Sequence, residues 1–256
     1  EGAKVSAKTT AIYGEQGVNL RGVKATTTQM ARAEFKNETA RLKTGLSSQD
    51  SSVQHYTATE LTTEQDLILG GKGDVHLTGV VANVDGALLA KNSGSLSFGS
   101  ERSSESYNLS DDMRFWGGLA GSKTVGTGRS AETVHGADFT VKGDATLDAS
   151  RGVHISGSRV VTGGNGMVKV NAGALVIDST QAKTTAVDYA RQGTIFDITK
   201  ARQSSYTHTS TAKGSTLKSE SNLQLSTNKN VSIVGSTVQS AGLLDIAAKS
   251  GIEVKG

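Results

Sequence analysis

The stretch that decides the fold is Gly152-Val153-His154-Ile155-Ser156-Gly157. It places two β-branched apolar residues on either side of one polar residue, the alternation of a short β-strand that is buried on one face. The same pattern occurs in residues 73–79 (GDVHLTG) and residues 230–235 (NVSIVG). The first apolar residues of the copies, Val75, Val153 and Val231, are evenly spaced along the chain, with a period of about 78 residues. The chain therefore contains an internal repeat.

The spacing extends beyond these three copies. Leu69, Leu147 and Leu225 are separated by the same interval. A further copy of the pattern, residues 17–22 (GVNLRG), begins with Val18, and its distance from the next copy is shorter than the interval between the later ones. Agreement at this many apolar positions indicates a structural repeat whose equivalent side chains point into one core.

A shorter period lies inside each repeat. The segments from Val153 to Leu175 and from Val231 to Ile252 are nearly equal in length, and each holds three apolar pairs separated by polar and glycine residues. A unit this small cannot bury its own apolar face, so we predict stacked coils. The predicted fold is all-β: a right-handed parallel β-helix with three short strands per coil of about 21–22 residues. The predicted core ladder contains Val75, Leu77, Val153, Ile155, Val231 and Ile233.

The composition agrees with a core of small side chains. The 256 residues include no proline and no cysteine, only 4% are aromatic, and Ser and Thr together number 59. Proline would remove a hydrogen bond from a strand ladder. A doubly wound α/β fold needs crossovers of about a dozen residues between parallel strands, whereas the gaps here are about four, so that fold is excluded. The absence of cysteine excludes disulfides and thiolate chemistry.

The chain is predicted to be a single β-helix segment over residues 1–256, and we interpret it as part of a longer protein. Regular blocks alternate with polar excursions: the blocks cover about residues 1–24, 61–99, 137–180 and 214–256, and the excursions about residues 25–60, 100–136 and 181–213. The last two excursions have two alternating limbs around a tip, which predicts projecting hairpins. Residues 30–42 of the first excursion fit either a helix or a strand, and both stay open.

Charge and hydropathy exclude two kinds of protein. The net charge is +3, from 27 basic and 24 acidic residues, and no Lys/Arg run typical of nucleic-acid binding occurs. No apolar stretch approaches the length of about 18 residues that a membrane-spanning helix needs. We therefore expect no nucleic-acid partner and no transmembrane helix.

Candidate catalytic and metal-binding residues are few. His76 and His154 occupy the same outward position of the repeat, but about two coils, roughly 10 Å, separate them, too far for one zinc ion to bind both. Asp111-Asp112 is the only adjacent acidic pair, and it lies in an irregular excursion. We expect no catalytic residues and no metal site.

Three glycine-rich stretches are further candidates for ligand sites. Residues 70–74 and 163–167 lack the aspartate spacing of a calcium-binding β-roll, and residues 126–128 lack the third glycine of a dinucleotide site. We interpret all three as turns and expect no cofactor.

The excursions contain eight of the eleven aromatic residues. Exposed rings on projections suit contact with a partner or a membrane interface, although rings that pack on the flank of the β-helix would anchor the hairpins instead. The candidate contact residues are Phe35, Tyr107, Phe115, Trp116, Tyr189, Phe196 and Tyr206.

Residues 145–155 (ATLDASRGVHI) and 222–233 (NLQLSTNKNVSI) carry a resemblance to a known family. Together with the Ser/Thr-rich excursions, they resemble the haemagglutinin repeats of two-partner-secretion exoproteins. That family includes filamentous haemagglutinin adhesins and the toxin-bearing proteins of contact-dependent growth inhibition. The resemblance covers nearly the whole chain and carries no catalytic motif.

The resemblance implies a Gram-negative protein that is secreted or held at the cell surface, with a possible periplasmic stage during export. The implied partners are an outer-membrane two-partner-secretion transporter and a target-cell outer membrane or surface receptor. The implied function is that of a rod that helps to deliver a C-terminal toxin into neighbouring bacteria. An adhesin stalk that binds host cells is the alternative, and a β-helix carbohydrate-active enzyme is a third hypothesis, disfavoured because the outward residues are mainly Ser, Thr, His, Lys and Asn.

Overall fold

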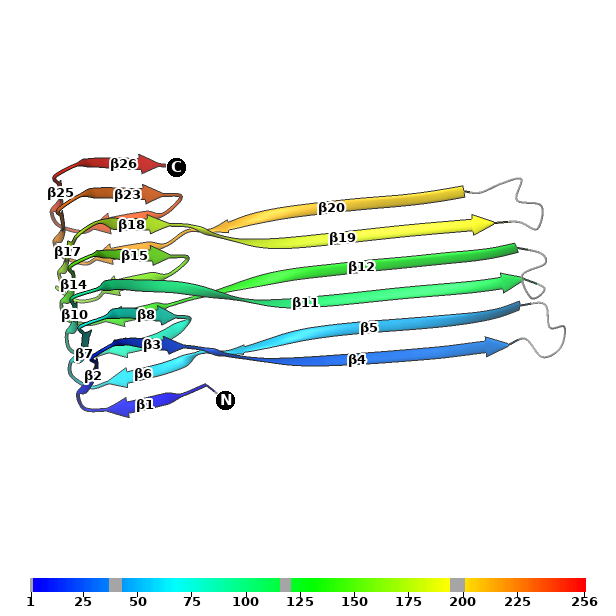
Figure 1. Ribbon diagram of the computed structural model, residues 1–256, viewed down its shortest axis with the longest axis horizontal. Helices are drawn as coiled ribbons and strands as arrows, with labels where there is room; N and C mark the ends of the chain where they lie inside the picture. Colours follow the sequence, from blue (N-terminus) through cyan, green and yellow to red (C-terminus); the bar gives the residue numbers. More distant parts are fainter. Residues whose placement is uncertain (1, 37–42, 116–120, 194–200) are drawn as a thin grey trace.

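The computed structural model describes residues 2–36, 43–115, 121–193 and 201–256, and every regular element in these ranges is a β-strand. The strands form two parts (Figure 1). One part is a column of short stacked strands that contains both termini, and the other is a single layer of long strands that projects from one side of the column. The all-β fold predicted from the sequence is confirmed.

The column consists of three parallel sheets, each with one strand from every coil. The first sheet contains β1 (Lys4–Ala7), β6 (Thr59–Thr63), β9 (Val80–Val84), β13 (Asp138–Val141), β16 (Arg159–Thr162), β21 (Thr216–Ser219) and β24 (Thr237–Ser240). The second contains β2 (Thr10–Gly14), β7 (Leu67–Gly71), β10 (Leu88–Asn92), β14 (Ala145–Ala149), β17 (Val168–Ala172), β22 (Leu223–Thr227) and β25 (Leu244–Ala248). The third contains β3 (Gly17–Arg21), β8 (Asp74–Thr78), the first residues of β11 (Ser95–Phe115), β15 (Gly152–Ser156), β18 (Leu175–Asp178), β23 (Asn230–Val234) and β26 (Gly251–Lys255).

This arrangement is the predicted parallel β-helix, and its register explains the repeat. In the third sheet Val75 pairs with Leu96, and Leu96 pairs with Val153. One repeat unit, from Val75 to Val153, therefore contains two coils and one excursion. The first interval, from Val18 to Val75, is shorter because these two residues lie in adjacent coils.

The three excursions are antiparallel hairpins, as the sequence predicted for the last two. They pair β4 (Val23–Lys36) with β5 (Lys43–Thr57), β11 with β12 (Gly121–Gly136), and β19 (Thr180–Gly193) with β20 (Ala201–Lys213). For residues 30–42 of the first excursion the sequence fitted either a helix or a strand. Residues 30–36 lie in strand β4. Alternation of Ala, Arg and Glu on an exposed strand thus prevails over helix propensity because neighbouring strands supply hydrogen bonds.

The hairpins join into one sheet because their spacing matches that of the coils. A hairpin leaves the column after every second coil, and two coils rise about 9.6 Å, which equals the width of two hydrogen-bonded strands. Neighbouring hairpins therefore meet edge to edge, so that β5 pairs with β11 and β12 with β19, both antiparallel. We call the antiparallel layer of β4, β5, residues 100–115 of β11, β12, β19 and β20 the lateral sheet.

Coils without a hairpin close their corner with glycine. Gly79, Gly157 and Gly235 follow the third strand of their coils, with φ angles of 59°, 56° and 55°. These left-handed angles are accessible to glycine at little cost. At the same corner of the other coils the chain leaves into a hairpin, so the repeat alternates a closed corner with an open one.

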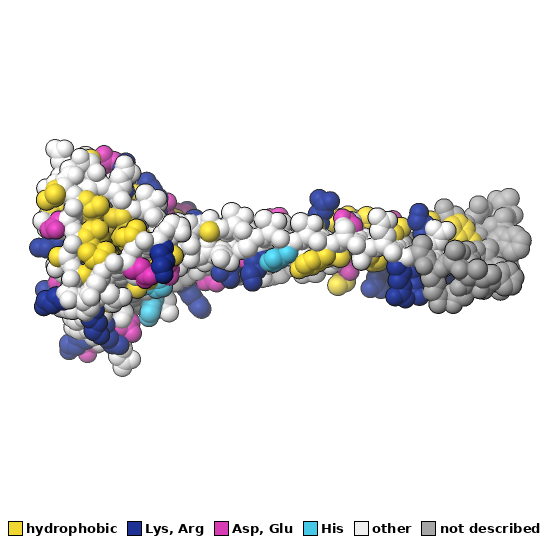
Figure 2. Space-filling model, turned by 90° about the horizontal axis from the view of Figure 1, so that it is seen from above, with side chains coloured by type: hydrophobic (Ala, Val, Ile, Leu, Met, Phe, Trp, Pro, Cys, Tyr) yellow, Lys and Arg dark blue, Asp and Glu magenta, His cyan; other side chains and the backbone are white. Residues whose placement is uncertain are grey.

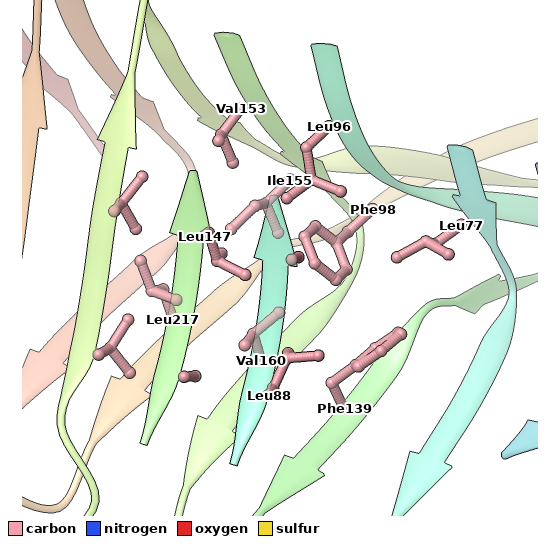
Figure 3. Packing of buried hydrophobic residues seen from close by; sticks show 14 of the residues in the cluster. Leu77, Leu88, Leu96, Phe98, Phe139, Leu147, Val153, Ile155, Val160 and Leu217 are labelled. Carbon is pink, nitrogen blue, oxygen red and sulfur yellow. The ribbon is translucent and has the colours of Figure 1, made fainter. Parts of the chain in front are cut away.

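The core is the narrow interior of the column. The predicted ladder residues are all buried, from 0% exposure at Leu77 and Ile155 to 5% at Ile233. Two phenylalanines, Phe98 and Phe139, are the largest core side chains and meet edge to face with centroids 5.1 Å apart (Figure 3). Leu, Val, Ile and Ala make up the rest of the apolar cluster, and buried Thr, Ser and Asn side chains occupy inward positions at the strand ends.

Of the three glycine-rich stretches predicted to be turns, one is a turn, one contains a turn, and one is not a turn. Residues 163–167 do form a turn, with Gly164 at a φ of 60°. In residues 70–74, Gly70 and Gly71 end strand β7 and residues 72–73 form the bend before β8, whereas Gly126 and Gly128 lie inside β12. Glycine in these strands is explained by close packing rather than by a turn, as shown below for Gly126.

Candidate interaction surface

The lateral sheet is the part of the molecule that the β-helix does not need for its core. Figure 2 shows it almost edge-on as a narrow blade that extends from the column. Within the described residues no second layer of secondary structure covers either face. A sheet normally buries one face against another layer, so a long sheet with two open faces offers surface for contact with other molecules.

The strand register assigns each side chain to a face, because directly opposite residues in antiparallel strands share a face. One row runs from Leu46 through Asp112, Thr124 and Arg191 to Arg202. We call this face, with the residues two positions along each strand, the tyrosine face. Its exposed apolar and aromatic side chains and its arginines are Met30, Leu46, Tyr189, Tyr206, Arg32, Arg114, Arg191 and Arg202.

The large apolar side chains of β11 on the opposite face are half-buried, and we call it the alanine face after its many alanines. Its members include Ala31, Ala33, Val53, Tyr107, Leu109, Asp111, Val125, Ala131, Ala186, Asp188 and Ala190. Shallow concavities lie on both faces: two of about 300 and 450 Å³ on this face, near Leu109 and near Val53, and one of about 440 Å³ on the tyrosine face, near Asn108 and Val187. The two faces therefore differ in the exposure of their large apolar groups.

Tyr189 is held in place by a glycine on the neighbouring strand. Gly126 of β12 lies directly opposite it, and a Cβ atom at this glycine would collide with the tyrosine ring. The ring thus lies across Gly126, and its hydroxyl donates a hydrogen bond to Oγ of Ser110 at 3.2 Å. The side chain stays 40% exposed. This packing is the reason for a glycine in the middle of β12.

Two arginines stand opposite each other near the far end of the tyrosine face. Arg191 of β19 pairs directly with Arg202 of β20, and both are exposed. Their row also contains Glu34, on the outermost strand β4, and Asp112, which accepts a hydrogen bond from Thr124 and lies 3.6 Å from Nε of Arg114. Like charges on directly opposite residues destabilise a sheet, so this pair opposes folding and suits an anionic contact.

A compact polar cluster joins the lateral sheet to the column. The ring of Tyr56 stacks on His135 with centroids 4.2 Å apart, and its hydroxyl donates a 2.5 Å hydrogen bond to the carbonyl of Gly79. A Cβ atom at Gly79 or at Gly22 would collide with that hydroxyl. The imidazole Nε2 of His135 lies 2.8 Å from Oγ of Ser103. We call Tyr56, His135 and Ser103 the junction cluster.

Charged residues surround the junction cluster. Lys24 and Glu101 form an ion pair at 2.5 Å, and Nζ of Lys213 donates a hydrogen bond to the carbonyl of Val134 at 3.1 Å. Burial lowers the pKa of His135, and the ammonium groups of Lys213 and Lys24 lower it further. Burial also raises the pKa of Tyr56, with a further contribution from Glu101. Both groups are therefore held in their neutral forms.

The predicted contact residues fall into three groups. Tyr189 and Tyr206 lie on the tyrosine face, 40% and 69% exposed, whereas Tyr107 and Phe115 lie half-buried on the alanine face. Trp116 and Phe196, and the side chain of Phe35, lie outside the described residues. The partner role of all these residues stays a prediction.

Sequence reasoning missed the arginines and the junction cluster. Arg191 lies two residues after Tyr189, so strand alternation by itself places both on one face. The pairing of Arg191 with Arg202 required the hairpin register, which the sequence did not supply. Tyr56 and His135 come from two different hairpins, and no local pattern connects them.

The candidate catalytic and metal residues do not assemble into a site. Asp111 and Asp112 point to opposite faces of the lateral sheet because they are consecutive in β11. His76 and His154 lie two coils apart in the third sheet, and Nε2 of His154 is 3.1 Å from a carboxylate oxygen of Asp178. Among the described side chains, no three His, Asp or Glu residues gather as metal ligands.

The described residues also contain no helix of the length and hydropathy needed to cross a membrane.

Comparison with known proteins finds one family match and two relatives. The "Hemagglutinin repeat" family matches residues 196–256. Over 256 residues the chain is 27% identical to "Hemolysin" from Proteus mirabilis and 29% identical to "Hemolysin" from Serratia marcescens. It spans 16% of the length of each of these relatives. No solved structure matches it significantly. The haemagglutinin-repeat match in residues 196–256, the stacked coils and the likeness to the two hemolysins along the entire chain agree with the resemblance seen in the sequence, which is to the haemagglutinin repeats of exoproteins.

Proposed function

We propose that this chain is a non-catalytic rod segment of a secreted bacterial surface exoprotein, in which the β-helix is the rod and the lateral sheet contacts the target cell. One observation carries the proposal: six long strands project in a single layer with both faces in solvent. The core of the column is complete without them, because the ladder residues are buried by stacked coils. Such a projection therefore serves contact rather than folding.

Export through an outer-membrane two-partner-secretion transporter is part of the proposal. The likeness to haemagglutinin repeats and to the two hemolysins supports this route and a final position in the medium or at the cell surface, with a periplasmic stage during export. The chain has no cysteine, so it passes a pore without a disulfide to reduce. Stacked coils fold progressively as they emerge, each on its neighbour.

The finer proposal is delivery of a C-terminal toxin by contact with the target outer membrane. The two relatives are named hemolysins, which supports action of the parent protein on the membrane of another cell. A host-cell adhesin stalk is the alternative. It predicts that binding depends on a receptor and not on lipid.

A carbohydrate-active β-helix is the third hypothesis, and the geometry disfavours it. Asp111 and Asp112 cannot act as a general acid and base on one substrate, since the sheet lies between their carboxylates. The chain is expected to release no reducing ends and no unsaturated products from polysaccharides. Release of either product by the purified chain would contradict the non-catalytic assignment.

The closed corners show how to test the lateral sheet by excision. Deleting residues 23–58, 100–135 and 179–213 leaves Gly22, Gly136 and Gly214 in the corner positions that Gly79, Gly157 and Gly235 occupy in the other coils. We expect the shortened rod to fold, because the coils keep their register and their core. Its β-structure and melting temperature are checked by circular dichroism before any binding experiment.

Binding to bacterial outer-membrane vesicles is then compared for the full chain and the excised rod. We expect the full chain to bind and the folded rod to lose binding. Equal binding by both proteins would show that the contact lies on the column and not on the lateral sheet, and it would overturn the proposal. Binding by the full chain to host cells alone would support the adhesin alternative.

A further inference from the structure

We propose that the tyrosine face of the lateral sheet binds a phosphate-bearing anionic lipid surface, with Arg191 and Arg202 as charged contacts and Tyr189 and Tyr206 as interfacial anchors. The inference rests on the proposed function, since it assumes that the lateral sheet meets a membrane. It goes beyond that function by naming one of the two faces and the chemistry of the lipid.

The arginine pair is the first argument. Arg191 and Arg202 face each other across β19 and β20, an arrangement that costs stability in the free protein. No carboxylate among the described residues lies within 4 Å of either guanidinium. A phosphate group between them would accept hydrogen bonds from both and remove the repulsion. Among the described residues, then, this pair breaks a local rule without a carboxylate that compensates for it, which is typical of a functional site.

The exposed apolar groups are the second argument. Met30 is 71% exposed, Tyr206 69%, Leu46 43% and Tyr189 40%, and all four lie on the tyrosine face. Met30 and Tyr206 are at opposite ends of one row across the sheet, so these groups are spread over a surface rather than gathered in one pocket. Tyrosines beside arginines suit the boundary between lipid headgroups and acyl chains.

The difference between the faces is the third argument. On the alanine face, Lys123 and Arg129 are accompanied by three acids, Glu105, Asp111 and Asp188. Over the same stretch of the tyrosine face, which reaches its far end, four arginines are accompanied by three acids, Glu34, Asp50 and Asp112. Figure 2 shows Lys and Arg side chains gathered toward this end of the blade. Charge complementarity therefore favours an anionic surface on the tyrosine face.

The test compares two double variants of the full chain that remove equal charge from opposite faces. The variant R191Q/R202Q removes the arginine pair, and K123Q/R129Q removes two exposed cations from the alanine face. Co-sedimentation measures binding to vesicles of pure phosphatidylcholine and of phosphatidylcholine mixed with phosphatidylglycerol. Melting temperatures are measured in parallel, and R191Q/R202Q should be at least as stable as the wild type because a repulsive pair is removed.

We expect the wild type to bind the mixed vesicles more tightly than pure phosphatidylcholine, and less tightly as salt rises. R191Q/R202Q should lower the partition coefficient for mixed vesicles by more than about tenfold, since each cation at an anionic surface contributes about a factor of five. K123Q/R129Q should change it by less than about twofold. Equal losses in the two variants would mean that only net charge matters and would overturn the assignment of the face.

Two further results separate this inference from the proposed function. Equal binding of the wild type to both kinds of vesicle would overturn the anionic-lipid inference and leave membrane contact intact. Binding to outer-membrane vesicles without binding to either lipid vesicle would overturn it as well and indicate a receptor instead. Loss of all binding, including that to outer-membrane vesicles, would contradict the proposed function itself.

Discussion

Glycine at the closed corners is required by the backbone and by packing together. Gly157 has a φ of 56°, and a Cβ atom there would collide with the Cγ2 atom of Thr180. We expect Gly157→Ala to destabilise the protein by about 1–3 kcal/mol, measured by chemical denaturation. Gly251→Ala is the matched control, because its Cβ would meet no atom within 4 Å. Similar losses for the two variants would contradict this account of the corner.

Inward and outward positions alternate residue by residue along each coil, and one pair of neighbours tests the assignment. Leu147 is 0% exposed in the core (Figure 3), whereas its neighbour Thr146 points outward and lies beside Lys169 of the next coil. Leu147→Asp should cost more than about 3 kcal/mol, because it buries an unpaired charge. Thr146→Asp should leave the melting temperature nearly unchanged. An unaltered melting temperature for Leu147→Asp would contradict the predicted ladder.

The hairpins depend on the column through the junction cluster, and this dependence predicts an effect of pH. Because the pKa of His135 is lowered in the folded protein, the unfolded chain takes up a proton more readily. The histidine therefore contributes stability above its unfolded pKa of about 6.5, and this contribution is lost as pH falls below that value. We expect the melting temperature of the wild type to fall further between pH 8 and pH 5 than that of His135→Asn.

The Asn variant is the suitable comparison for His135 because it keeps a polar group beside Ser103 but does not titrate. Carboxylates elsewhere, such as Asp74, whose pKa is lowered by the backbone N–H of Ser95, affect both proteins equally at low pH. The difference between the two melting curves thus isolates His135. Parallel curves over this pH range would show that the junction cluster is not a source of pH sensitivity.

At the scale of the whole molecule, β-helix and lateral sheet are held by different forces. The column buries a continuous apolar core, whereas the lateral sheet has hydrogen bonds and side-chain contacts with solvent on both faces. Local openings therefore require less free energy in the lateral sheet. Strand β11 crosses from one part to the other: Leu96 and Phe98 are buried in the column, and residues 100–115 lie in the lateral sheet.

Hydrogen exchange measured by mass spectrometry should show this division within a single strand. We expect amides of residues 95–99 to exchange much more slowly than those of residues 105–115, and the outer strands β4 and β20 to exchange fastest of all. The central strands β11 and β12 of the lateral sheet should be intermediate, because each is hydrogen-bonded on both sides. Uniform protection along β11 would contradict the division into two parts.

The sequence by itself determined the coil, since apolar residues that alternate with polar ones and recur with a constant period leave one way to bury them. Val75, Val153 and Val231 were placed in one ladder by spacing, and the structure buries all three. The repeat also carried Gly79, Gly157 and Gly235 at the same constant interval, a signal for the closed corner that is recognisable once the φ angles are known.

Only the tertiary structure decided that the hairpins form one sheet with two unlike faces. Alternation within a strand shows which residues share a face of that strand. It does not show which residues of the neighbouring hairpin lie on the same face of the sheet. That choice follows from the equality of two coil rises with two strand widths, which brings Leu109 opposite Gln49 and Val125 opposite Ala190. The candidate surface thus arises from pairing between segments that are far apart in the chain, at separations over which no local pattern acts.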